Sequence, residues 1–506
     1  MHKQFINNLY DNRFWLFKAV ILLACMGFIL RVYVPALHIG FLSDDYIFLA
    51  MDKSISKYLV PAVRTFRYSP LGMLLFKGLV ACFGHQPTAI RLVYLIMYLA
   101  TAVLLYRLAY LLKGNAGLAL LCVLLFVSFA FSYEVLYWLS AAIFYVPLVL
   151  LFLLGCVLFA RYRANMPWIV MGIILLAYGL MLGFHEAGIT FLLVLPACYG
   201  LCPRKAGNCN KDKVYLLFFG LAFITVLFVF AAMHFTKMLE KQSPSVIQMA
   251  HNMLQYNRYA LSIAKLGQDN MVIATLSLGT VLLLSLAALK RQKLLLLLLI
   301  IMELTFILFA ASGLQARYFY LGSCFFSTWL VFAGHAVYTW FADHRRHSFR
   351  RLATPVLLLM VVLLGARVLY HADYARQRLH EWQLASSIND KVTRKVADYF
   401  RKNPQTKEIV LLNLPDSIGS RRWPAYVFRN GLHCNLDVTC KNLNEKVKIS
   451  YIIDSKMSKM KRYVAKLAQN KDGRAVFIYD KTQSCLRLLS TTEEIDSLYN
   501  HTKPKT

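Results

Sequence analysis

Residues 137–160 read YWLSAAIFYVPLVLLFLLGCVLFA and contain no Asp, Glu, Lys or Arg. A helix of about 20 apolar residues is needed to cross a hydrocarbon layer ~30 Å thick. This stretch therefore predicts a membrane-spanning helix. Tyr137 and Trp138 stand at its start, as expected for aromatic side chains at a membrane–water interface.

Comparable apolar stretches recur along the chain as far as about residue 371, and then stop. We predict further spans near 15–37, 91–112, 116–132, 167–184, 188–202, 214–236, 270–289, 294–312, 319–341 and 352–371. Segment 69–84 is shorter and is interrupted by Lys77. We interpret it as a re-entrant or interfacial helix, with a full crossing as the alternative.

The composition agrees with a chain that needs lipid. It is 58% hydrophobic and only 16% charged, which is too apolar for an ordinary soluble protein of 506 residues. The N-terminal run lacks a small-residue cleavage site, so we expect an uncleaved first helix. The predicted fold class is an α-helical polytopic membrane protein with about 11 to 12 transmembrane helices.

Residues 372–506 have a different character from residues 1–371. They hold 25 Lys and Arg and 14 Asp and Glu, so we predict a membrane domain over 1–371 and a soluble domain over 372–506. The pattern indicates a small α/β domain. We expect a helix over 374–400, strands near 409–412, 449–453, 476–479 and 485–489, and a short helix near Tyr426.

The net charge of +31 could indicate a nucleic-acid partner, but the charges of the membrane part collect in short basic connections. That is the pattern of topology signals beside anionic lipid, so we predict no nucleic-acid binding. The connections contain Arg161 and Arg163, then Arg204, Lys205, Lys211 and Lys213, then Lys290, Arg291 and Lys293, then Arg345, Arg346, Arg350 and Arg351.

These basic connections alternate with the connections around Glu134, His185 and Arg317 and with residues 237–269. By the positive-inside rule the basic set is cytoplasmic and the other set is extracytoplasmic. The same count of crossings places the C-terminal domain outside. We expect a multi-pass protein of a bacterial inner membrane.

The cysteines suggest one bridge and one weaker alternative. Cys434 and Cys440 would lie in an oxidising compartment if the C-terminal domain is outside, so we predict a disulfide between them. Cys198, Cys202 and Cys209 gather near one basic connection, where buried or loop thiols are a better explanation than a metal site.

Acidic residues are rare in the membrane part, with 11 Asp and Glu against 31 Lys and Arg. Asp44 and Asp45 follow the first helix directly, at the outer interface. A positioned carboxylate there can accept the proton of a sugar hydroxyl as a glycosidic bond forms, so both are candidate catalytic residues. The alternative is a helix cap or a solvated interfacial acid.

Glu134, His185 and Glu186 are further catalytic candidates. Glu134 lies between two spans, and its aromatic neighbours do not explain it. His185 and Glu186 lie where one span ends and another begins, and ionisable groups at such depth are functional candidates by default. A packed interhelical pair is the alternative for the last two.

A phosphate-binding role is predicted for Arg317 and Tyr318, and for Arg67 in the first external connection. An arginine presents a planar, bidentate donor set to phosphate oxygens, and aromatic neighbours suit an adjoining prenyl chain. Lipid headgroup contact is the alternative, and it fits Arg64 better than it fits Arg317.

Taken in order, these motifs resemble the GT-C superfamily of membrane glycosyltransferases. They are Asp44-Asp45-Tyr46, Arg67-Tyr68-Ser69-Pro70-Leu71, Tyr133-Glu134-Val135 with Trp138, His185-Glu186 and Arg317-Tyr318-Phe319-Tyr320. Within that superfamily they look like family 39-like protein O-mannosyltransferases and the aminoarabinose transferases of lipid A. The resemblance covers residues 15–371. Members often show Asp-Glu at the first motif and Lys-Glu or a similar pair where this chain has His185-Glu186.

The resemblance implies an activity. A polyprenyl-phosphate sugar is the donor, a glycan, lipid or protein of the cell envelope is the acceptor, and transfer occurs outside with inversion at the anomeric carbon. It also implies an essential acid at Asp44 or Asp45. A divalent metal ion between carboxylate and phosphate is left open. The competing interpretations are a transporter or flippase of polyprenyl-linked glycans and an assembly protein.

Overall fold

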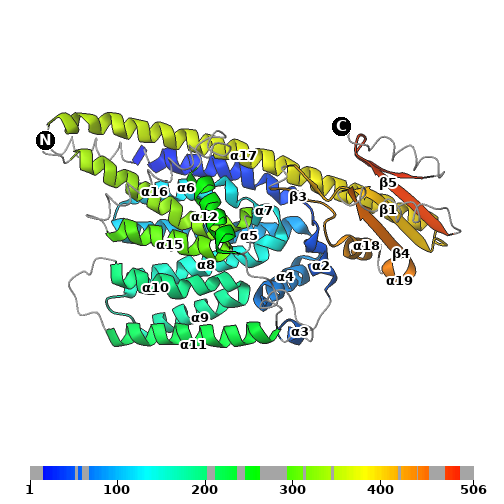
Figure 1. The fold of residues 1–506 in the computed structure, drawn as a ribbon, viewed down its shortest axis with the longest axis horizontal. Coiled ribbons are helices and arrows are strands. Elements are labelled where there is room, and N and C mark those ends of the chain that lie inside the picture. Colours follow the sequence, from blue (N-terminus) through cyan, green and yellow to red (C-terminus); the bar gives the residue numbers. More distant parts are fainter. Residues whose placement is uncertain are drawn as a thin grey trace.

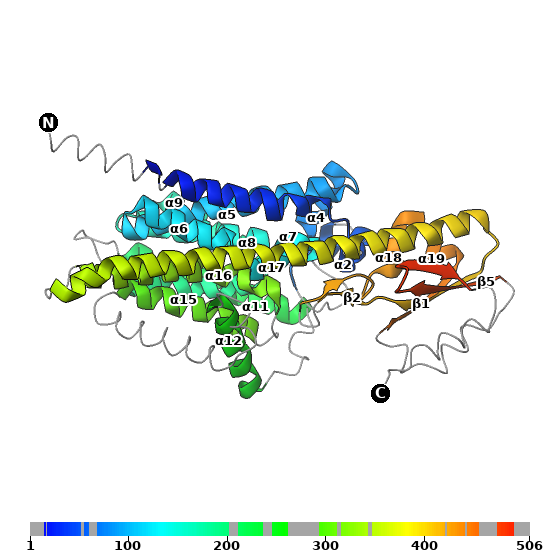
Figure 2. The same ribbon diagram turned by 90° about the horizontal axis from the view of Figure 1, so that it is seen from above.

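The computed structural model describes residues 15–16, 18–51, 55–59, 68–201, 211–235, 245–261, 293–310, 315–342, 347–419, 423–440, 443–454 and 473–489. These residues form a bundle of long helices and a small sheet domain that lies at one end of the bundle (Figure 1). The sheet domain joins the bundle through one very long helix, α17 (Figure 2).

Most helices of the bundle run along the long axis of the molecule (Figure 1). They are the first span (Lys18–His38), α5 (Pro87–Lys113), α6 (Ala116–Val127), α8 (Leu139–Tyr162), α9 (Trp168–Phe184), α10 (Thr190–Leu201), α11 (Lys211–Phe235), α15 (Lys293–Ala310), α16 (Phe319–Ala342) and α17 (His347–Lys402). A further amphipathic helix, α12 (Val246–Leu261), lies against α15.

Within the described residues, six helices are long and apolar enough to cross a membrane, or seven if a bent pair counts as one span. The shorter α9 and α10 account for two more of the predicted spans. The predicted span 270–289 lies outside the described residues. The chain is therefore a polytopic helical membrane protein, as predicted.

The bent pair replaces the predicted span 116–132. Helix α6 ends at Val127, and the chain turns by 54° through η3 (Ala130–Ser132) into α7 (Glu134–Tyr137). The backbone N–H of Ala130 donates to Nδ1 of His371 on α17 at 3.1 Å. A side chain that takes a helical donor interrupts the helical ladder and produces such a bend. The bend brings Glu134 to the end of the bundle that faces the sheet domain.

Three short helices follow the first span at that same end (Figure 1). They are α2 (Asp44–Ala50), α3 (Ile55–Leu59) and α4 (Pro70–Phe83). Helix α4 has 14 residues, which is ~21 Å at 1.5 Å per residue and too short for a full crossing. This length agrees with the predicted re-entrant or interfacial helix at 69–84.

Helix α17 runs without a break for 56 residues, about 84 Å. The predicted span 352–371 and the predicted helix 374–400 are thus one element. No Gly or Pro occurs between residues 366 and 403, so nothing in the sequence ends the helix where the composition changes. The proposed domain boundary at 371 falls inside this helix.

The sheet domain has four strands in the order β4-β1-β5-β6. Their bounds are β1 (Glu408–Leu414), β4 (Lys448–Ile453), β5 (Arg474–Asp480) and β6 (Cys485–Leu488). β1 pairs in parallel with β4 and β5, and β5 pairs antiparallel with β6. All four predicted strands are therefore confirmed. They were predictable because apolar β-forming residues between turn residues are typical of buried strands.

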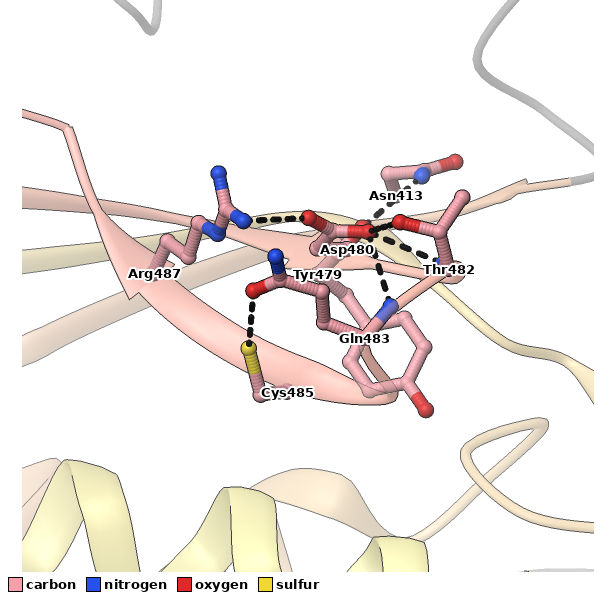
Figure 3. Close-up of polar contacts among 7 residues, drawn as sticks. All are labelled: Asn413, Tyr479, Asp480, Thr482, Gln483, Cys485 and Arg487. Carbon is pink, nitrogen blue, oxygen red and sulfur yellow. Dashed lines mark hydrogen bonds and ion pairs between the residues drawn. The ribbon is translucent and has the colours of Figure 1, made fainter.

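The turn between β5 and β6 is closed by one carboxylate (Figure 3). Asp480 Oδ1 accepts hydrogen bonds from the backbone N–H groups of Thr482 and Gln483 at 2.9 and 3.2 Å, and from the Thr482 hydroxyl at 2.6 Å. Its Oδ2 lies 3.0 Å from Nη2 of Arg487 on the returning strand. These hydrogen bonds lower the pKa of Asp480.

Two predictions for this domain are wrong. Tyr426 lies in a strand, β3 (Ala425–Tyr426), paired with β2 (Ser417–Ile418), and not in a helix. Cys434 and Cys440 are free thiols on one helix, α18 (Leu432–Cys440), and not the predicted disulfide. They are six positions apart on the helix, which is ~9 Å along its axis and beyond the ~7 Å between Cα atoms that a disulfide tolerates. A last short helix, α19 (Leu443–Lys446), follows.

Candidate functional site

Asp45 is a buried residue of α2 whose carboxylate lies at the start of α8. Its Oδ1 accepts the backbone N–H of Ser140 at 2.7 Å and also the Ser140 hydroxyl, and its Oδ2 accepts the backbone N–H of Leu42 at 3.0 Å. The side chain is fully buried. Burial raises the pKa of Asp45 to about 6, against the Arg91 charge and the hydrogen bonds, which lower it. The carboxylate therefore links the connection after the first span to α8.

Arg91 on α5 binds two segments of the chain, one after the first span and one between α7 and α8. Its guanidinium donates to the carbonyl oxygens of Ile39 at 2.8 Å and Gly40 at 3.0 Å. It also donates to the carbonyl oxygens of Leu136 and Tyr137, both at 3.0 Å. Arg91 thereby holds the segments that lead to Asp44 and that follow Glu134.

Asp44 differs from its neighbour in both exposure and partners. Its side chain is partly exposed, and Oδ1 is buried without a hydrogen-bond partner. It opens α2, directly after Ser43, whose φ of 47° and ψ of −114° lie outside the favoured regions for an L-residue. Strained backbone of this kind gathers at functional sites. Of the two carboxylates, Asp44 is therefore the one with an oxygen that has no hydrogen-bond partner.

Glu134 and Arg317 form a buried ion pair. Arg317 Nη1 lies 2.5 Å from Glu134 Oε1, and the backbone N–H of Arg317 donates to Oε2 at 3.1 Å. The Arg317 side chain is 16% exposed and that of Glu134 is 8% exposed. Arg317 lies in η6 (Ala316–Tyr318), the turn that starts α16, and η6 contacts α7. The two carboxylate oxygens fix both the backbone and the side chain of Arg317.

Aromatic rings surround the Arg317 guanidinium. Its Cζ lies 5.1 Å from the ring centre of Trp138 and 5.2 Å from that of Tyr318, within cation–π range. Tyr426 of the sheet domain contacts Trp138, with ring centres 5.2 Å apart. Burial raises the pKa of Tyr426, and the nearby Glu134 carboxylate raises it further. The sheet domain thus contributes a side chain to this cluster.

His185 is held by partners on both ring nitrogens. Nδ1 accepts the backbone N–H of Ala187 at 3.0 Å, so the proton of a neutral ring is on Nε2, which lies 2.9 Å from the Tyr145 hydroxyl. The ring is buried and caps η4 (Glu186–Ile189). Because Nδ1 carries no proton in this arrangement, the Glu186 Oε2 atom 3.4 Å away makes no ion pair with it.

The candidates therefore gather around the first turns of α8. Ser140 there binds Asp45, Trp138 lies beside Arg317, and Tyr145 contacts both His185 and Tyr318, with ring centres 4.6 and 6.0 Å apart. Arg64 and Arg67 lie outside the described residues. Among the described residues, no three His, Cys, Asp or Glu side chains are close enough together to hold a metal ion.

The sheet domain packs against the segment that contains Asp44. Gly431 has a φ of 79°, and a Cβ atom placed there would lie 2.2 Å from the Ser43 carbonyl oxygen. Asn389 of α17 donates to the Phe41 carbonyl oxygen and to the Tyr46 hydroxyl, both at 3.3 Å, and accepts from Asn435 of α18 at 3.0 Å. These contacts order Asp44 from the side of the sheet domain.

The chain was compared with family models, with curated proteins and with solved structures. No family model and no curated protein matches it. It is similar in structure to ArnT from Cupriavidus metallidurans in the apo state, with a TM-score of 0.46 and 15% identity over 94% of each chain. ArnT bound to undecaprenyl phosphate gives 0.41 and 14% identity, over 93% of this chain and 94% of that one.

The chain is also similar to the archaeal oligosaccharyltransferase AglB from Archaeoglobus fulgidus, in complex with an inhibitory peptide and a dolichol-phosphate. The TM-score is 0.49 at 10% identity, over 95% of this chain and 75% of that one.

Arg91 and Tyr426 belong to the site but were not predicted. The sequence did contain a sign of Arg91. It is a charged residue at the start of an apolar span, and a charged residue at such a position is by default a candidate for a functional or structural role. No local pattern pointed to Tyr426, because its contact with Trp138 joins two segments that are far apart in the sequence.

Proposed function

We propose that this chain is a membrane glycosyltransferase of the GT-C type. It moves a sugar from a polyprenyl-phosphate donor to a glycan, lipid or protein acceptor of the cell envelope, on the extracytoplasmic face. The observation that carries the proposal is the contrast between two adjacent carboxylates. Asp45 is fully committed to Ser140 and Leu42, whereas Asp44 keeps a buried oxygen without a partner.

Asp44 acts as the general base. The acceptor hydroxyl oxygen attacks the anomeric carbon from the side opposite the phosphate, its proton passes to the Asp44 carboxylate, and the bond between the anomeric carbon and the phosphate oxygen breaks. The lipid phosphate leaves with the electron pair, so the anomeric configuration inverts. A hydroxyl is a poor nucleophile, and such proton transfer contributes typically ~10²–10⁴-fold to rate.

Arg317 is the phosphate-binding residue. Glu134 engages Nη1 and the backbone N–H, which orients the guanidinium and leaves its other N–H groups for phosphate oxygens. The Trp138 and Tyr318 rings on either side fit an adjoining prenyl chain. Glu134 is therefore a positioning residue in this proposal, and Asp45 and His185 have structural roles. A divalent metal ion, if one takes part, would add positive charge at the leaving phosphate.

The experiment is a deletion of the gene followed by mass spectrometry of the envelope glycans. We expect one sugar to be missing, restored by the wild-type gene and not by Asp44→Asn at equal protein level. The missing sugar would identify donor and acceptor together. An unchanged glycan profile, or full restoration by Asp44→Asn, would reject the proposal.

A further inference from the structure

One segment of the sheet domain, residues 426–431, spans the candidate site. It begins at Tyr426, whose ring centre lies 5.2 Å from that of Trp138. It ends at Gly431, where a Cβ atom would lie 2.2 Å from the Ser43 carbonyl oxygen. Helix α18, which follows, contacts α2, and the two lie side by side in Figure 1. The segment therefore reaches from the aromatic cluster to the residue that precedes the proposed base.

Arg429 is the charged residue of this segment. Its side chain is exposed, whereas Val427 and Phe428 before it are buried. The guanidinium Cζ lies 4.9 Å from the ring centre of Tyr426, within cation–π range. Among the residues that the structure describes, no carboxylate makes an ion pair with Arg429. Its charge is therefore held beside the aromatic cluster without an anion to offset it.

Two guanidinium groups flank Tyr426. Arg317 lies over the Trp138 ring that Tyr426 contacts, and Arg429 lies over the Tyr426 ring itself. Burial raises the pKa of Tyr426 and the Glu134 carboxylate raises it further, while Arg317 and Arg429 both lower it. One carboxylate and two guanidiniums thus act on the same hydroxyl, and their sum is +1. Because Glu134 is already paired with Arg317, this region favours a further anion.

Exposure falls along the row from Arg429 to Arg317. Arg429 is exposed, Tyr426 is half-buried, and the Arg317 side chain is 16% exposed. An anion that enters from the surroundings therefore meets Arg429 before it reaches Arg317. Each guanidinium has five N–H donors in a planar fork that matches phosphate oxygens, and the ion pair with Glu134 leaves donors of Arg317 unused.

We infer that Arg429 is a second phosphate-binding residue for the polyprenyl-phosphate donor, supplied by the sheet domain. The inference rests on the proposed function, which assigns the donor phosphate to Arg317. Arg429 donates to phosphate oxygens that Arg317 leaves free. The bound phosphate then connects the sheet domain to the membrane bundle beside the proposed base, so donor binding orders the segment 426–431 next to Asp44.

The test is native mass spectrometry of the full-length protein in detergent, titrated with undecaprenyl phosphate. We expect Arg429→Gln to weaken binding about tenfold, because one charge-assisted contact is lost. Arg429→Lys should recover part of the affinity, since it keeps the charge but not the planar fork. Arg401→Gln makes the same charge change at an arginine that is 73% exposed near the C-terminal end of α17. It is the matched control and should bind as the wild type does.

A lipid without the phosphate separates recognition from a structural effect. Undecaprenol should bind equally to the wild type and to Arg429→Gln, because the variant removes only a phosphate contact. Equal losses for both lipids would overturn the inference, as would unchanged binding of undecaprenyl phosphate by Arg429→Gln. Arg317→Ala distinguishes the two proposals. Unchanged binding by Arg317→Ala would reject the donor site itself, whereas a loss there with none in Arg429→Gln would reject only the role of Arg429.

Discussion

Asp45 Oδ1 accepts the backbone N–H of Ser140, a residue 95 positions away, at 2.7 Å. This bond distinguishes two adjacent acids that look equivalent in the sequence. It places Asp45 at the first turn of α8, where backbone N–H groups have no helical partner and a negative charge is favoured. Asp44, the preceding residue and the first of α2, has a buried Oδ1 without a hydrogen-bond partner.

The first prediction separates activity from stability at these two positions. Asp44→Asn should leave donor-lipid binding and the unfolding temperature unchanged, while turnover falls ~10²–10⁴-fold because the base is lost. Asp45→Ala should instead destabilise the fold by a few kcal/mol, because the buried N–H groups of Leu42 and Ser140 lose their acceptor. Donor binding, sugar transfer and thermal unfolding are measured separately on purified protein in nanodiscs. Wild-type turnover by Asp44→Asn would contradict the assignment.

The second prediction concerns the pair of Glu134 and Arg317. Arg317→Ala should lower donor affinity by a few kcal/mol, and Arg317→Lys should recover only part of it, since an ammonium cannot both bind Glu134 and present a planar fork to phosphate. Glu134→Ala should cost ~3–5 kcal/mol of stability, because it leaves a buried charge unpaired. The double variant should lose less than the sum of the singles.

The control for this cycle is the exposed pair of Asp398 and Arg401, whose side chains are 59% and 73% exposed. Removing either partner should change stability by less than ~1 kcal/mol and leave donor binding intact. Additive effects at Glu134 and Arg317, on both stability and donor affinity, would show that the two residues do not act as a unit.

The third prediction tests whether sugar transfer requires the contact between the sheet domain and the segment that contains Asp44. Gly431 and Gly473 share a φ of 79°, so alanine strains the backbone equally at both. At Gly431 a Cβ atom would also lie 2.2 Å from the Ser43 carbonyl oxygen, whereas at Gly473 its nearest contact is 3.4 Å. Gly431→Ala should therefore reduce sugar transfer and increase hydrogen exchange over α2, and Gly473→Ala should do neither. Equal behaviour of the two variants would exclude a role for this contact.

The fourth prediction is a pH dependence of stability that comes from Asp45. Its pKa is raised on folding from 3.8 to about 6, so the folded state binds the proton more tightly than the unfolded state does. Its stabilising contribution is therefore fully present below about pH 4 and is lost as the pH rises through about 6. Relative to Asp45→Asn, which does not titrate, the wild type should gain thermal stability as the pH falls from 7 to 4. A constant difference between the two would contradict the raised pKa.

Local patterns were enough to predict most elements. Long apolar runs and alternating apolar strands are properties of neighbouring residues, so the spans near 15–37, 91–112, 137–160, 214–236 and 319–341 and the four strands of the sheet were predictable. The predictions failed where a distant residue decides the local conformation. His371 ends the helix that the apolar pattern continues to 132, and pairing with β2 makes a strand of the segment around Tyr426.

The sequence by itself determined that this is a polytopic membrane protein with a C-terminal α/β domain, and that its rare acids, with the exception of Glu303, lie at the ends of the spans or between them. Apolar length and charge counts decide these properties, and both are local. Only the tertiary structure decided that Asp45 binds Ser140 while Asp44 keeps an oxygen without a hydrogen-bond partner, and that Arg317 pairs with Glu134 across 183 positions. Such pairings depend on how the helices pack, because a buried charge takes whichever partner the packing brings within hydrogen-bond distance.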